Sequence, residues 1–446
     1  MSELRRALGL FSCTMLVVGN MIGVGIFTTP GRIANVLPSS GWILAAWVLG
    51  ALLAMAGALA YAELGAAFPF AGGNYQFLRE GFGRFWGFLY GWSATFITQS
   101  GTVAILAVGF TKYAGIEDPR LVQLTAAGLI LVFGGLNYLG VRVGAGIVDA
   151  ITALKVAAIL GFAGAAVFLG HGSAAHLLPL GNPTSATTGP WAIASGMAMA
   201  LIPIMYTYSG WNATVYVGSE VKNPERTIPL SLMGGVLLTA TLYLLLNLIY
   251  FYAMPIGEMR GVIAIARDAS NRLFSPAVAS SISFFIAFSI LGCLNATLLT
   301  APRIPFAMAE RGDLFAFFGK VHPRYRTPSN AIAFVTLWAV VLALWGGLDH
   351  KHFYRLLDDY VTVPSLAINA LTVGVLFHLR RQRPDLPRPY RAWGYPVLPL
   401  AFVAIVMWMV VVEFRHDPGA ALMGLVMMAA GAPFYLGIRR LTGGNR

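Results

Sequence analysis

Long stretches without a charged residue constrain this chain more than any other feature of its sequence. The runs Trp42–Ala60, Leu121–Tyr138 and Leu230–Tyr252 contain no Asp, Glu, Lys or Arg. Each is close to the ~20 residues that an α-helix needs to cross the hydrocarbon core of a bilayer. Inside lipid every backbone polar group needs an internal partner, which a helix supplies. The runs therefore predict an all-α integral membrane protein.

About twelve such spans fit along the 446 residues, of which 57% are hydrophobic and 11% are charged. A soluble domain usually has about 25% charged residues. No connection between spans is long enough for a separate soluble domain, so we expect one domain over residues 1–446. The predicted spans cover residues 9–37, 42–66, 84–113, 121–139, 144–170, 190–217, 228–254, 275–307, 330–347, 354–379, 396–414 and 418–438.

Lysine and arginine residues predict the orientation, because cytoplasmic loops of membrane proteins have more of them than outer loops. With the N-terminus in the cytoplasm, twenty fall on the inner side and nine on the outer side. We therefore expect both termini on the cytoplasmic side of a cell (inner or plasma) membrane. This distribution also explains the net charge of +12 without a nucleic-acid partner. The apolar run after Arg5 and Arg6 has no small-residue cleavage site, so it is expected to be the first span.

Two predicted spans contain residues that interrupt a helix. The first contains GNMIGVGIFTTPG (Gly19–Gly31), and the sixth contains YTYSGWNATVYVGSE (Tyr206–Glu220) after Pro203. Glycine and proline are poor helix formers, and irregular backbone persists in a membrane only where it lines a cavity or is buried in protein. The interruption recurs after five spans, which is the pattern of a transporter binding site. The alternative is that the glycines allow close helix packing.

An interrupted helix offers polar backbone groups to a ligand. The N-terminus of a half-helix presents unpaired N–H groups and a positive dipole end, which suit an anion. The C-terminus of the other half-helix presents carbonyl groups, which suit a cation. A zwitterionic amino acid has a carboxylate and an ammonium on one carbon. Two neighbouring interruptions therefore predict an amino acid site.

Five stretches of the sequence resemble the amino acid–polyamine–organocation superfamily, and within it the L-type amino acid transporter branch. One is the interrupted first span. The others are YAELGAAFPFAGGNY (Tyr61–Tyr75), VDAITALKVAAIL (Val148–Leu160), SGWNATVYVGSEVKNPERTIPLSL (Ser209–Leu232) and LNATLLTAPRIPFAMAERGDL (Leu294–Leu314). The resemblance covers spans one to ten well and the last two weakly. It implies a LeuT-type fold of two inverted five-helix repeats (residues 9–170 and 190–379) plus two accessory helices (396–438), with helices 1 and 6 discontinuous.

The resemblance also implies roles for residues at the two interruptions. The backbone N–H groups of Val24 and Gly25 would take the substrate carboxylate, although the family commonly has a serine hydroxyl where Val24 stands. The carbonyl groups of Met21, Tyr206 and Ser209 would take the ammonium, and Tyr206 also stands where the family often has an aromatic gate. Asparagines on spans six and eight are predicted to line the pocket, with bonding between helices as the alternative. The remaining binding candidates are Ile22, Gly23, Gly210, Asn212 and Asn295.

Lys155 lies well inside the fifth span, roughly 16 Å along the helix from its start. A charge at the bilayer centre costs at least ~2.5–3.5 kcal/mol, so such a residue is a functional candidate, although a long lysine can also extend to the surface. We expect its ammonium to replace a sodium ion, touching carbonyls near Gly19–Ile22 and the Ser289 hydroxyl, and the resemblance implies the same. Glu63 and Asp149 are expected to pair with inner-loop arginines, with proton coupling as the alternative.

Together these features predict sodium-independent secondary transport, as an exchanger or a facilitator, of small or medium neutral L-amino acids by alternating access. The alternative is proton-coupled transport of an amino acid or a polyamine, with Lys155 or Glu63 titrating. The sequence has no HExxH, GxSxG or mid-membrane Ser–His pair, which argues against an enzyme, and no cofactor or metal is expected. The loop KYAGIEDPRLVQ has no cysteine for a disulfide-linked heavy chain, so we expect a stand-alone monomer or weak homo-oligomer.

Overall fold

The computed structural model describes residues 4–178, 190–274, 276–346 and 350–441. Within these ranges nine helices are long and apolar enough to cross a membrane, or ten if the bent pair α1 (Leu10–Met21) and α2 (Gly25–Ile33) is one span. Shorter apolar helices, α9 (Pro190–Thr207) and α16 (Ser329–Gly346), occupy the sixth and ninth predicted spans. The all-α membrane fold is confirmed, whereas the count of twelve spans remains a prediction.

The other helices follow the predicted spans, although residues 275 and 347, at the ends of two predicted spans, lie outside the described residues. The long helices are α3 (Ser40–Ala67), α5 (Arg84–Ser93) continued by a π-helix (Ala94–Thr98) and α6 (Gln99–Tyr113), α7 (Pro119–Tyr138), α8 (Val141–Leu169), α11 (Pro224–Ala253), α14 (Pro276–Thr300), α17 (His350–Gln382), α18 (Val397–His416), α19 (Pro418–Ala429) and α20 (Gly431–Leu441). The connecting helices are α4 (Asn74–Phe82), α10 (Ala213–Tyr216), α12 (Ile256–Met259), α13 (Ile265–Leu273) and α15 (Arg303–Glu310).

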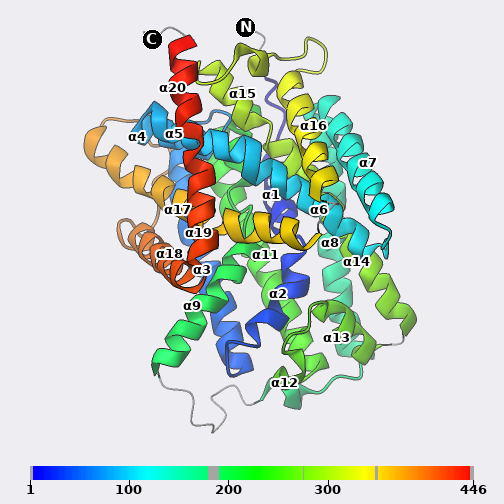
Figure 1. Ribbon diagram of the computed structural model, residues 1–446. Coiled ribbons are helices and arrows are strands. Elements are labelled where there is room, and N and C mark those ends of the chain that lie inside the picture. The colour runs from blue at the N-terminus through cyan, green and yellow to red at the C-terminus, as the bar shows by residue number, and fades with distance from the viewer. Residues whose placement is uncertain (1–3, 179–189, 275, 347–349, 442–446) are drawn as a thin grey trace.

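The segment before α1 and the end of α20 lie at the same end of the bundle, where α4 and α15 also lie (Figure 1). The helices α12 and α13 lie at the opposite end, beside α2 (Figure 1). With both ends of the described chain on one side, the chain crosses the bundle an even number of times. Which side faces the cytoplasm remains a prediction from the arginine distribution.

Backbone hydrogen bonds and one buried ion pair join the segments at the end of the bundle where α4 and α15 lie. The carbonyl of Glu220 accepts hydrogen bonds from Ala7 N (2.8 Å) and Leu8 N (3.0 Å). The Arg303 guanidinium of α15 donates two hydrogen bonds to the Glu220 carboxylate, both at 2.9 Å, and both side chains are fully buried. Because a buried charge is costly unless it is paired, this ion pair fixes the segment after α10 against α15.

Candidate functional site

The first interruption lies between α1 and α2, whose axes differ by 44°. The α1 helix ends at Met21 and α2 begins at Gly25, with Val24 at the N-cap position and no side-chain cap. The first N–H groups of a helix have no partner in a preceding turn. Unpaired N–H groups and the positive dipole end of α2 therefore face the interruption. The glycine pattern predicted the break near Gly23–Gly25, and the structure has it at residues 22–24.

The carbonyl groups at the end of α1 each have a side-chain partner, which replaces the lost helical hydrogen bonds. These partners come from three other helices. The contacts are Lys155 Nζ with Gly19 O (3.4 Å) and Ile22 O (2.7 Å), Cys293 Sγ with Asn20 O (3.3 Å), Tyr243 Oη with Met21 O (2.6 Å), and Ser289 Oγ with Ile22 O (3.4 Å).

Lys155 comes from α8 and is completely buried. Within the part of the chain that the structure describes, no acidic side chain forms an ion pair with it. Its positive charge instead faces the negative dipole end of α1, where the carbonyl groups point. The Ser289 hydroxyl donates to the same Ile22 carbonyl at 3.4 Å, so both groups bind one oxygen. The ammonium therefore lies among the freed carbonyls of α1, which are the groups that suit a cation.

The second interruption lies between Thr207, at the end of α9, and Ala213, at the start of α10. Gly210 has φ +96°, a conformation that disfavours other residues, and a Cβ atom there would lie 2.7 Å from Asn20 Cβ. A Cβ atom on Gly25 would lie 2.6 Å from Thr207 Oγ1. The two interruptions therefore pack against each other through glycine.

Tyr243 of α11 connects the two interruptions. Its hydroxyl lies 2.6 Å from Met21 O and 3.0 Å from Thr207 O. A carbonyl oxygen has two lone pairs, and Met21 O already accepts from this hydroxyl and from Gly23 N at 2.9 Å. An ammonium at Met21 O would therefore have to share or displace one of these two donors. Tyr243 was not among the predicted site residues, and it stands inside the uncharged run Leu230–Tyr252. The sequence does contain one signal for this residue, a tyrosine hydroxyl within an apolar run that is long enough to span a membrane. A buried tyrosine hydroxyl usually needs a hydrogen-bond partner.

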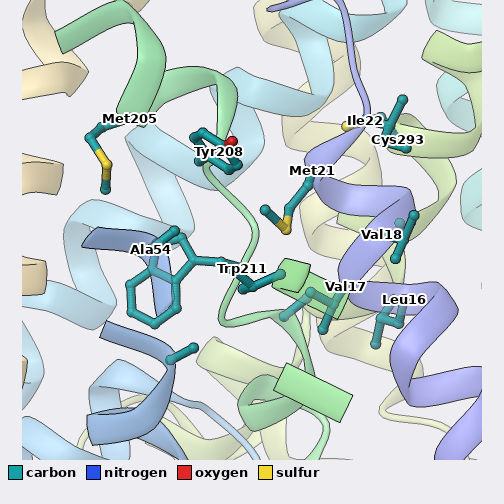
Figure 2. Close-up of a cluster of buried hydrophobic side chains, with 14 of the residues drawn as sticks. Leu16, Val17, Val18, Met21, Ile22, Ala54, Met205, Tyr208, Trp211 and Cys293 are labelled. Carbon is teal, nitrogen blue, oxygen red and sulfur yellow. The ribbon is translucent and has the colours of Figure 1, made fainter. Parts of the chain in front are cut away.

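The residues around the two interruptions differ in their exposure to solvent. On one face Met21, Tyr208 and Trp211 belong to a buried apolar cluster (Figure 2). On the other, the Tyr206 side chain is 41% exposed and Ser209 is exposed, although both lie in the sixth span. Tyr206 and Ser209 are therefore accessible, whereas Met21, Tyr208 and Trp211 are buried.

The two asparagines predicted for the pocket contact other helices. Asn212 Nδ2 lies 3.4 Å from Asn74 Oδ1. Asn295 donates to Gly144 O (3.1 Å) and accepts from Asn137 Nδ2 (2.7 Å). These contacts favour bonding between helices, which was the alternative to a role in the pocket.

The acidic side chains Glu63 of α3 and Asp149 of α8 have different partners. Glu63 accepts two hydrogen bonds from Arg380 (2.9 and 2.5 Å) and pairs with Arg388 (3.3 Å), so the predicted arginine pairing is confirmed there. The same prediction is wrong for Asp149, whose partner in the described chain is the Ser12 hydroxyl at 2.6 Å. Asp149 lies on α8 against α1, where the small serine leaves one carboxylate oxygen buried without a hydrogen bond.

A pocket at the hairpin of α12 and α13 lies apart from the interruptions. Among the described residues, no group of three or more His, Cys, Asp or Glu side chains is placed to hold a metal ion. The residues lining the pocket at this hairpin are Met254, Glu258, Val262, Asp268, Asn271 and Arg272.

Two interrupted helices that meet inside a multi-span bundle are typical of membrane transporters. The sequence matches the amino acid permease family over residues 8–431, and the chain belongs to that family. It is an amino acid transporter of the membrane and not an enzyme.

Curated relatives match nearly the whole chain. The serine/threonine exchanger SteT of Bacillus subtilis is 28% identical and covers 98% of each sequence. The human Asc-type amino acid transporter 1 is 30% identical over 98% of this chain and 83% of its own. The mouse b(0,+)-type amino acid transporter 1 is 27% identical over 97% of this chain and 88% of its own.

Proposed function

We propose that this chain exchanges small or medium neutral L-amino acids across a cell membrane, without sodium, by alternating access between the repeats 9–170 and 190–379. The observation that carries the proposal is the Lys155 ammonium, 2.7 Å from Ile22 O at the end of α1. A fixed cation at these carbonyls removes the need for a sodium ion there. Coupling to sodium would then have no site at the first interruption.

The two interruptions supply groups for both charges of the substrate. The carboxylate binds the N–H groups of Val24 and Gly25 at the start of α2, where the dipole end is positive. The ammonium binds the carbonyl oxygens of Met21, Tyr206 and Ser209. The exposed Tyr206 ring covers the bound amino acid, and Ile22, Gly23 and Gly210 shape the backbone around it.

Two acidic residues already have arginine partners, which favours a substrate with a neutral side chain. Glu63 pairs with Arg380 and Arg388, and Glu220 pairs with Arg303, so neither carboxylate is available to a cationic substrate. The name of the Bacillus subtilis relative, a serine/threonine exchanger, also indicates small neutral amino acids.

The chain is proposed to act without a heavy-chain partner, as a monomer or weak homo-oligomer. The loop KYAGIEDPRLVQ has no cysteine, and Cys13 and Cys293 are both buried as free thiols. The inner-side excess of lysine and arginine supports cytoplasmic termini in an inner or plasma membrane.

Proteoliposome exchange tests the proposed function. Vesicles loaded with unlabelled serine, alanine, leucine, arginine or nothing would be given labelled serine outside, with and without sodium and a pH gradient. We expect uptake only into vesicles loaded with a neutral amino acid, unchanged by either gradient. Equal uptake into empty vesicles would contradict exchange, and uptake driven by the pH gradient would favour the proton-coupled alternative.

A further inference from the structure

The inner loop between α17 and α18, residues 383–396, is held in shape by its own contacts. The Arg388 guanidinium donates to the backbone carbonyl oxygens of Leu379, Arg383, Pro384 and Leu386 at 2.8–3.1 Å. Glu63 of α3 accepts a hydrogen bond from Ala392 N at 2.7 Å. The loop is therefore a fixed part of the inner surface, and its outward side chains are not needed to hold it.

The Glu63 carboxylate brings two parts of this region together. It binds the Arg380 side chain at the end of α17 and the Ala392 N–H in the loop. The Arg380 guanidinium also lies 3.8 Å from the centre of the Tyr395 ring. Arg381 follows Arg380 in the sequence, and Arg391 precedes Ala392. Because the Glu63 carboxylate binds both Arg380 and Ala392, Arg381 and Arg391 lie in one region of the surface.

Arg381 and Arg391 are exposed. In the described ranges neither has an ion-pair partner, whereas the exposed Arg383 reaches Glu80 Oε2 at 3.2 Å. From residue 380 to residue 400 the sequence has five arginines and one acidic residue. Arg381 and Arg391 therefore leave two positive charges on the exposed side of the loop that no acidic side chain of the described structure neutralises.

Exposed apolar side chains lie next to these positive charges and extend into the start of α18. Trp393 is 69% exposed, Val397 is 68% exposed and Leu400 is 53% exposed. Val397 is the first residue of α18, which is long and apolar enough to cross the membrane. Tryptophan favours the membrane–water interface because its ring is amphipathic. Arg391 and Trp393 therefore lie where lipid headgroups meet acyl chains.

We propose that Arg381, Arg391, Trp393 and Val397 form a binding surface for an anionic phospholipid of the inner leaflet. A guanidinium pairs with phosphate oxygens through two parallel N–H groups, and basic clusters directly inside a membrane helix attract anionic lipids. The acyl chains lie along Trp393 and Val397. A soluble acidic partner fits less well, because the apolar part of the surface continues into a spanning helix. This proposal does not depend on the transported substrate.

Lipid retention tests this surface. The full chain would be reconstituted in phosphatidylcholine vesicles with and without phosphatidylglycerol, and spin-labelled lipids of both kinds would report the immobilised fraction. We expect phosphatidylglycerol to be preferred. The double variant Arg381→Gln/Arg391→Gln should lower that preference by about fivefold per arginine, because each arginine near the surface contributes about that factor. Added salt should weaken it in the wild type.

Arg415→Gln is the matched control, since Arg415 is exposed at the opposite end of α18. It should leave the preference unchanged, and Trp393→Ala should reduce retention of both lipids. Elution volume and thermal stability of the double variant should match the wild type, because neither arginine holds the loop. Equal immobilisation of both lipids by the wild type would overturn the proposal. Displacement of phosphatidylglycerol by soluble polyglutamate would also overturn it and would indicate a protein-binding surface.

Discussion

Lys155 Nζ lies 2.7 Å from Ile22 O, and this contact joins α8 to the point where α1 unwinds. The lysine is completely buried, and its ammonium also lies 3.4 Å from Gly19 O. A fixed charge at this position holds the end of α1 against α8 for as long as the contact lasts. Movement of α1 relative to α8 during transport would then have to break a charge-assisted hydrogen bond.

Replacement of Lys155 by methionine keeps most of the side-chain volume and removes the charge. Hydrogen bonds to charged groups contribute about 1.5–3 kcal/mol, so we expect exchange to fall about tenfold to a hundredfold. Proteoliposome exchange kinetics measure the effect. The control is Lys112→Met, since Lys112 is exposed at the end of α6 and should tolerate the change. Unchanged kinetics in Lys155→Met would remove this residue from the mechanism.

Replacement of sodium by choline should leave wild-type exchange unchanged, because the lysine ammonium already occupies the carbonyl groups that a sodium ion would use. The measurement is initial uptake of labelled substrate at equal osmolarity on both sides. A sodium ionophore should likewise have no effect. Accumulation that follows an imposed sodium gradient would contradict both the prediction and the proposed role of Lys155.

Tyr243→Phe removes the hydroxyl between Met21 O and Thr207 O while the ring continues to pack. A hydrogen bond of this kind contributes about 0.5–1.5 kcal/mol, so the apparent affinity for the amino acid should fall about twofold to tenfold. Tyr250→Phe is the control on the same helix, because the buried Tyr250 hydroxyl has no hydrogen-bond partner in the described chain. Concentration dependence of exchange measures both variants, and equal effects would argue against a role for the bridge.

The sequence predicts the spans and both interruptions because each depends on a local property. Span length follows from the bilayer, and the break at Gly210 follows from glycine at a positive φ close to α1. The partners of the freed carbonyls depend instead on how helices far apart in sequence are rotated, so the sequence could indicate that the Tyr243 hydroxyl needs a partner but not which carbonyl groups it contacts. The π-helix Ala94–Thr98 was also missed, since its sequence has no helix breaker; Trp338 Nε1 of α16 donates to Phe96 O within it at 2.8 Å.

Gly210→Ala should disrupt the contact between the two interruptions. A residue other than glycine at φ +96° is strained by about 1–3 kcal/mol, and the new Cβ would lie 2.7 Å from Asn20 Cβ. We expect exchange to be lost and the thermal unfolding temperature to fall. Gly109→Ala is the control, because a Cβ atom there has no neighbour within 4 Å in the described structure. Wild-type exchange by Gly210→Ala would show that the interruptions do not need this contact.

Glu220→Gln should destabilise the protein far more than the same change in an exposed ion pair. Glu220 and Arg303 are both fully buried, and removal of one partner from a buried pair costs about 3–5 kcal/mol. The control is Glu258→Gln, whose partner Arg272 is 45% exposed, and exposed pairs contribute about 0–1 kcal/mol. Thermal unfolding in detergent measures both. The double variant Glu220→Gln/Arg303→Met should recover part of the loss, because it leaves no charge buried without a partner. Equal changes in the unfolding temperature of Glu220→Gln and Glu258→Gln would mean that water reaches the Glu220–Arg303 pair. The ion pair would then not fix the segment after α10.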